Sequence, residues 1–79
     1  MSEEVLIREI LRRRDPHGYY VVPIKEEALP LVRQYLARPG VVLVEYSDVL
    51  LFKTRSRSLA EKVATALARR GLLASEEEF

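Results

Sequence analysis

The single histidine is the first residue whose chemistry has to be considered. His17 stands two residues after Asp15 in the sequence Asp-Pro-His-Gly. An imidazole that catalyses or binds a metal needs a nucleophile, an orienting carboxylate or further ligands at suitable spacing. Proline and glycine on either side of His17 are typical of a turn instead. We therefore interpret His17 as a turn residue and predict neither a catalytic residue nor a metal site.

The composition excludes several other kinds of chemistry. The chain of 79 residues contains no cysteine, so disulfides, thiol catalysis, zinc fingers and iron–sulfur clusters are ruled out. Its paired glutamates stand where helices are expected to begin or in the C-terminal tail, and exposed carboxylates of this kind seldom have perturbed pKa values. We therefore expect a protein that is not an enzyme and needs no cofactor.

A short basic segment could bind phosphate. Lys53, Arg55 and Arg57 follow one another at alternate positions, in a stretch without acidic residues. Cationic side chains at the start of a helix favour anions such as a nucleic-acid backbone. The alternative interpretation is a solvated connection between a strand and a helix, because short basic runs are common.

A second basic segment stands beside aromatic residues. Arg12, Arg13 and Arg14 are followed closely by Tyr19 and Tyr20. Single-stranded nucleic acid binds such mixtures through phosphate contacts and base stacking. The alternative is a helix end whose arginines complement the helix dipole. Nucleic-acid binding is therefore our second functional hypothesis, carried by Lys53, Arg55, Arg57, Arg12, Arg13 and Arg14.

The overall charge and hydropathy indicate a folded domain. With 13 basic and 12 acidic residues, the formal charge of +1 argues against coating nucleic acid by bulk charge. Arginine outnumbers lysine and asparagine is absent, which fits a thermophilic source, although a GC-rich genome could give the same arginine bias. Since no targeting segment is visible and no apolar run approaches the roughly 20 residues that span a bilayer, we expect a cytoplasmic protein without a membrane partner.

Hydrophobic periodicity and turn residues predict the elements that must position these side chains. We expect a single domain over residues 1–79, with an α/β core over 19–74 and a frayed acidic tail over 75–79. Pro30 is tolerable only in the first turn of a helix, and Ser58 with Glu61 forms a capping box. The predicted elements are an amphipathic helix over 2–14, a strand over 19–22, a helix over 25–37, strands over 41–46 and 49–54, a helix over 58–70 and a short strand over 72–74.

The element order favours one fold over another. After the N-terminal amphipathic helix, the order is that of an α+β ferredoxin-like βαββα(β) sandwich. The alternative is a winged helix, which would need two helices between Ile24 and Pro39. In that fold the hairpin would be a wing, and Arg33, Gln34 and Arg38 would contact the bases.

The predicted hairpin gives the leading functional hypothesis. A turn at Ser47-Asp48 would place apolar residues on both faces of the sheet, so both faces need a cover. Helices can cover one face, and the other needs the N-terminal helix, a second subunit or a ligand with a flat apolar surface, of which the first two are favoured. We therefore expect a protein–protein interaction module, a homodimer or a subunit of a larger assembly, with its interface at Val42, Val44, Tyr46, Val49 and Leu51.

Overall fold

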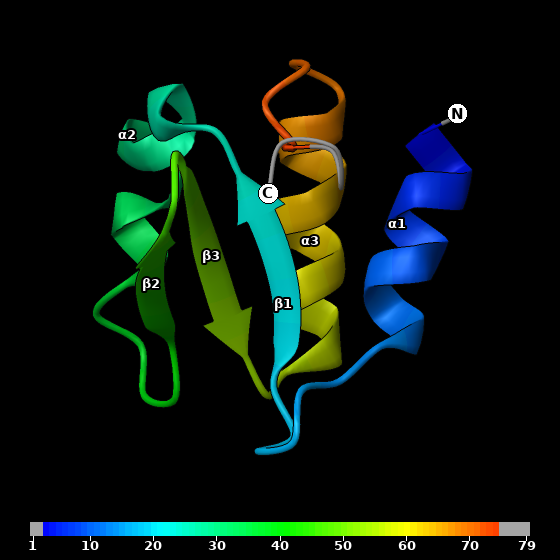
Figure 1. Cartoon of the computed structure of the whole chain (residues 1–79), viewed down its shortest axis with the longest axis vertical. Helices are drawn as coiled ribbons and strands as arrows, with labels where there is room; N and C mark the ends of the chain where they lie inside the picture. Colours follow the sequence, from blue (N-terminus) through cyan, green and yellow to red (C-terminus); the bar gives the residue numbers. More distant parts are fainter. Residues whose placement is uncertain (1–2, 75–79) are drawn as a thin grey trace.

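The structure, a computed structural model, describes residues 3–74, which form a small α+β domain (Figure 1). Helix α1 (Glu3–Arg12) is followed by strands β1 (Tyr20–Ile24), β2 (Val42–Tyr46) and β3 (Val49–Thr54) and by helix α3 (Arg57–Ala68). Between β1 and β2 lie the helical turns η1 (Glu26–Ala28), α2 (Leu29–Val32) and η2 (Arg33–Tyr35). The predicted class is confirmed, while the tail over 75–79 lies outside the described residues.

The three strands form an antiparallel sheet in the order β1-β3-β2, with β3 in the centre. The predicted hairpin register is confirmed, because Tyr46 pairs with Val49 and Val44 pairs with Leu51. Ser47 adopts a φ of 55°, a left-handed conformation that lets the two-residue turn close. Since side chains alternate along a strand, one sheet face packs against helices and the other faces away from them.

Residues 72–74 run along the other edge of β1, where the sequence predicts a short strand. Ile24 and Leu73 form an antiparallel bridge, and the N–H of Ala74 donates to the carbonyl of Pro23 at 3.0 Å. The N–H and C=O of one strand residue point to the same side, so the N–H that Pro23 lacks would also point to this edge. The ladder between β1 and β3 therefore loses no hydrogen bond to the proline.

The helix predicted over 25–37 is broken into short turns. Pro30 stands in the first turn of α2, as expected. Because proline has no N–H, an α-helix could not continue unbroken from Glu26 through this position, and the N–H of Leu29 bonds to the carbonyl of Glu26 in a tighter turn. Within residues 24–39 the chain therefore forms one irregular helical segment, and not the two helices that a winged helix needs.

Helix α3 begins earlier than the sequence predicts. Its N-cap is Ser56, whose backbone is extended and whose Oγ accepts a hydrogen bond from the N–H of Leu59 at 3.2 Å. The predicted capping box of Ser58 and Glu61 is therefore wrong. The hydroxyl of Ser58 instead lies 3.1 Å from that of Ser56. This shift places Arg57 in the first turn of the helix.

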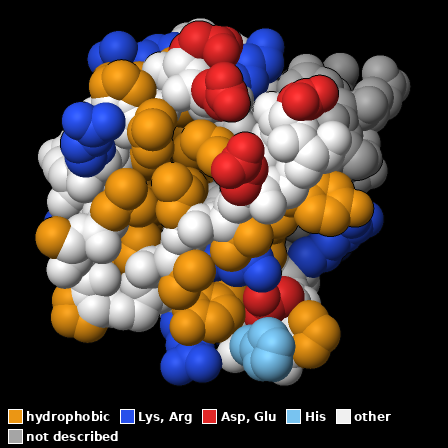
Figure 2. All heavy atoms as spheres, turned by 60° about the vertical axis from the view of Figure 1, so that its left-hand side comes forward, with side chains coloured by type: hydrophobic (Ala, Val, Ile, Leu, Met, Phe, Trp, Pro, Cys, Tyr) orange, Lys and Arg blue, Asp and Glu red, His pale blue; other side chains and the backbone are white. Residues whose placement is uncertain are grey.

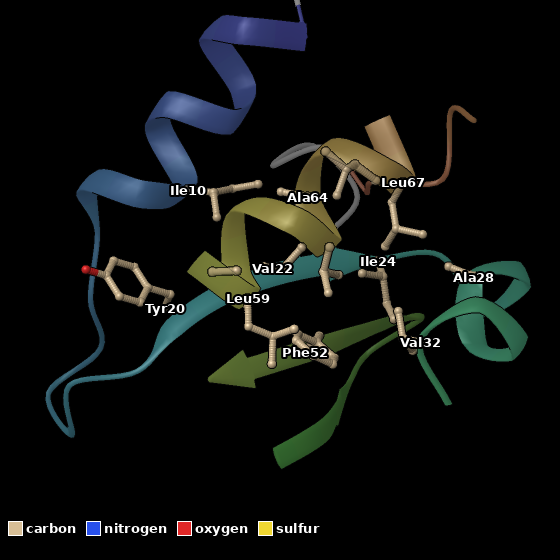
Figure 3. Close-up of a cluster of buried hydrophobic side chains, with 13 residues drawn as sticks. Ile10, Tyr20, Val22, Ile24, Ala28, Val32, Phe52, Leu59, Ala64 and Leu67 are labelled. Carbon is tan, nitrogen blue, oxygen red and sulfur yellow. The ribbon is translucent and has the colours of Figure 1, made fainter. Parts of the chain in front are cut away.

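The core lies between the inner face of the sheet and the helices (Figure 3). Phe52 at the centre of β3 is fully buried, as are Val22 and Ile24 on β1. Ala60 and Ala64 on α3 are also fully buried, and their small side chains let the helix lie close to the sheet. Helix α1 adds Ile10 to the core and ends at Arg12, because Arg14 already pairs with Tyr20 in an isolated bridge.

Candidate functional site

The sheet face that points away from α3, here called the outer face, is largely apolar. Its β2 and β3 positions follow from the confirmed register, and those on β1 follow from the pairing of Val21 with Lys53 and of Pro23 with Leu51. Lys53 is its one charged member. The outer face consists of Val21, Pro23, Val42, Val44, Tyr46, Val49, Leu51 and Lys53.

The exposed part of the outer face lies mainly on the edge strand β2. Val42 is 39% exposed and Tyr46 is 54% exposed, while Val44 and Leu51 are half-buried. Val49, predicted as an interface residue, is only 2% exposed and so offers almost no surface to a partner. Seen from the side on which β2 lies, hydrophobic side chains spread across the surface and are bordered by charged ones (Figure 2).

Helix α1 does not lie over the outer face. It packs beside α3 and along the edge of β1, on the inner side of the sheet (Figures 1 and 3). A groove of about 500 Å³ separates α1 from β1, and Leu6, Ile10, Val21 and Pro23 are among its lining residues. Because Val21 and Pro23 belong to both surfaces, the groove continues the outer face toward α1. Among the described residues, no helix covers this face.

The two basic segments meet at one end of the domain, although they are far apart in the sequence. The ammonium of Lys53 lies 3.2 Å from Oδ2 of Asp15, in the turn between α1 and β1. Arg55 stacks over the ring of Tyr19 at 4.6 Å, measured from the guanidinium carbon to the ring centroid. We call this region the basic end, and it comprises Arg12, Arg13, Arg14, Lys53, Arg55 and Arg57.

The remaining cations of the basic end differ in their contacts. Arg14 lies 4.8 Å from the centroid of the Tyr20 ring and donates to the Tyr20 hydroxyl at 2.6 Å. Arg12 and Arg13 both approach Glu9, at 3.9 and 3.5 Å. The single carboxylate of Glu9 offsets one of these two positive charges, and exposed ion pairs of this kind contribute little to stability. Arg57 is exposed and forms no ion pair with any described residue.

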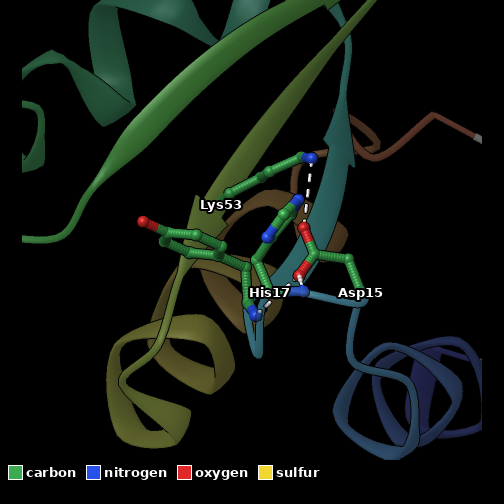
Figure 4. A network of polar contacts seen from close by, with 4 residues as sticks. Asp15, His17 and Lys53 are labelled. Carbon is green, nitrogen blue, oxygen red and sulfur yellow. Dashed lines mark hydrogen bonds and ion pairs between the residues drawn. The ribbon is translucent and has the colours of Figure 1, made fainter.

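The turn over residues 15–19 is organised by Asp15 (Figure 4). Oδ1 of this carboxylate accepts the N–H groups of both His17 and Tyr19 at 2.9 Å. The pKa of Asp15 is lowered, chiefly because its carboxylate accepts the N–H of Tyr19. Desolvation acts in the opposite direction, while Lys53 and the N–H of His17 lower the pKa further. His17 is exposed, and its position in a turn is confirmed.

A neighbouring pocket adds two cations that were not predicted to lie here. Arg38 and Lys62 both lie over the ring of Tyr35, at 5.1 and 5.8 Å. They line a pocket of about 400 Å³ together with the hydroxyl residues Ser56 and Ser58. Arg38 was predicted only as a base contact of a winged helix, and no sequence pattern links it to Lys62. The two meet because the loop before β2 lies against the start of α3.

The described residues contain no cluster of three or more histidine, cysteine, aspartate or glutamate side chains that could hold a metal ion. Within residues 3–74, no helix has the length and apolar character needed to cross a membrane. Comparison of the chain with protein-family models, curated proteins and solved structures finds no match. The function therefore has to be argued from the outer face and the basic end themselves.

Proposed function

We propose that the protein is a non-enzymatic assembly module, and that two copies associate through the outer face of the sheet. The observation that carries this proposal is the position of α1, which packs beside α3 and leaves the outer face uncovered by any described helix. We also assign the core to the ferredoxin-like βαββα(β) arrangement, in which helices cover one sheet face and leave the other available.

The exposed residues support a second copy of the chain as the partner. Val42 and Tyr46 are two of the three large hydrophobic side chains that are exposed among the described residues. A twofold axis would bring the same apolar patch of each copy against the other, as in isologous dimers. Such an interface would bury outer-face side chains of the edge strand β2, which pairs only with β3 among the described strands.

A matched pair of substitutions tests this proposal. Val42→Glu places a charge on the outer face, and Val5→Glu places the same charge on α1. The two valines are almost equally exposed, at 39% for Val42 and 42% for Val5. We expect Val42→Glu to give a folded monomer and Val5→Glu to remain a dimer, as measured by sedimentation with circular dichroism as the folding check. A dimer that persists in Val42→Glu, or that is lost equally in both variants, would contradict the proposal.

A further inference from the structure

We propose that the basic end binds single-stranded nucleic acid, with its cations on the phosphates and Tyr19 against an unpaired base. This inference is independent of the proposed dimer, because most of the residues that carry it lie outside the outer face. Its first support is the distribution of charge. The basic end holds six of the 13 basic residues. Within residues 3–74, Glu9 and Asp15 provide the acidic partners of its ion pairs.

The local charge is therefore of opposite sign to the rest of the chain. With Glu9 and Asp15 counted, the basic end carries a formal +4, so a total of +1 leaves −3 for all other residues. A polyanion responds to such a local field more than to net charge. The near-neutral composition thus does not exclude nucleic acid, because the structure gathers the positive charge at one end.

The second support is the arrangement of cations around tyrosine rings. The guanidinium of Arg55 is held over Tyr19, so it keeps its charge while losing conformational freedom before a ligand arrives. Tyr19 is half-buried, whereas Tyr20 is only 2% exposed. Tyr19 is therefore the ring that can meet a base, and Tyr20 serves to hold Arg14 in place.

The third support is the pocket beside the basic end. Its lining includes Arg38 and Lys62 and the hydroxyls of Ser56 and Ser58, and none of its described lining residues is acidic. This pocket extends the cationic surface past the start of α3, so that successive phosphates of one strand find positive charge along a path. A duplex would hide its base faces from Tyr19, which is why we assign the surface to a single strand.

The test measures binding of a fluorescent oligouridylate of about 16 nucleotides by anisotropy. Arg55→Glu with Arg57→Glu reverses two charges of the basic end. Arg69→Glu with Arg70→Glu makes the same change in net charge beyond the other end of α3, where both arginines are exposed. We expect the first double variant to bind at least about tenfold more weakly and the second to bind within about threefold of the wild type.

The dependence on salt and on base stacking separates the two kinds of contact. The wild-type affinity should fall steeply with salt, and Arg55→Glu with Arg57→Glu should flatten the slope by about 0.7 for each phosphate that the variant no longer neutralises. Tyr19→Leu should weaken binding about tenfold with little change in slope, because stacking releases no counterions. Three results would overturn the proposal: no binding at about 50 mM salt, equal reductions of affinity in both double variants, or equal affinity for a duplex of the same length.

Discussion

The ammonium of Lys53, on the central strand β3, lies 3.2 Å from the carboxylate of Asp15, in the turn that joins α1 to β1. The two residues are 38 positions apart in the sequence. Their side chains are only 23% and 12% exposed, so this pair is less screened by solvent than the exposed pairs of Glu9. The contact fixes the turn against the sheet and thereby brings the two basic segments to the same end of the domain.

Replacing Asp15 should destabilise the domain in proportion to the hydrogen bonds that are removed. Asp15→Asn keeps an oxygen that can accept the N–H groups of His17 and Tyr19 but removes the charge that faces Lys53. Asp15→Ala removes all of these interactions. We expect the melting temperature to fall in the order wild type, Asp15→Asn, Asp15→Ala. Equal melting temperatures for the wild type and Asp15→Ala would show that this carboxylate does not hold the turn.

The stability should also depend on pH through this carboxylate. Because the pKa of Asp15 is lower in the folded chain than in the unfolded chain, its contribution is complete above the ordinary carboxyl pKa of about 4. The contribution then declines as the pH falls through the lowered pKa. Urea midpoints measured between about pH 6 and pH 2 should decline less steeply at the acid end in Asp15→Asn than in the wild type. Parallel curves would contradict this assignment.

The cap of α3 gives a prediction with a built-in control. Ser56 Oγ accepts the N–H of Leu59, whereas Ser58 Oγ contacts only the Ser56 hydroxyl. Ser56→Ala should lower the free energy of unfolding by about 1 kcal/mol. Ser58→Ala should lower it by a smaller amount, since no backbone donor loses its partner. Chemical denaturation measures the free energy of unfolding of the two variants. A larger decrease in Ser58→Ala than in Ser56→Ala would contradict this assignment and support a capping box over residues 58–61.

The turn between β2 and β3 stores a small amount of backbone strain. Ser47 is the one residue other than glycine with a positive φ in the described part of the chain. Asparagine tolerates this left-handed conformation better than serine does, so Ser47→Asn should stabilise the domain by about 0.5 kcal/mol. Asp48→Asn, at the other turn position, should have little effect. A loss of stability in Ser47→Asn would indicate that the serine side chain has a role beyond the turn.

The sequence was sufficient to predict the sheet because local signals agreed there. The two-residue turn at Ser47-Asp48 sets the register of the hairpin and thereby places Leu43 and Phe52 together on the inner face. The helix over 25–37 was less well predicted. Its apolar periodicity indicates one continuous helix, whereas Pro30 lacks the N–H that an α-helix running through this position would need. The start of α3 was predicted wrongly because Ser58 and Glu61 match the sequence pattern of a capping box. In the structure the backbone is extended at Ser56, so this earlier serine is the N-cap.

The arrangement of the candidate surfaces depends on contacts between distant segments. An amphipathic pattern shows that α1 must bury one side, but it does not say whether α3 or the outer face covers that side. Likewise, no local pattern indicates that Lys53 meets Asp15, or that Arg38 and Lys62 share the ring of Tyr35. The hairpin part of the outer face was therefore predictable, whereas the position of α1 and the grouping of the basic end were not.

The most direct test of the assembly proposal is the mass of the wild-type protein in solution, measured by light scattering at low and high salt. An interface formed by the apolar outer face gains little from electrostatics, so association should persist or strengthen as salt rises. We predict a species of twice the 9.1 kDa chain mass at both about 50 mM and about 500 mM salt. A mass of 9.1 kDa at both salt concentrations, at protein concentrations well into the micromolar range, would contradict the proposal.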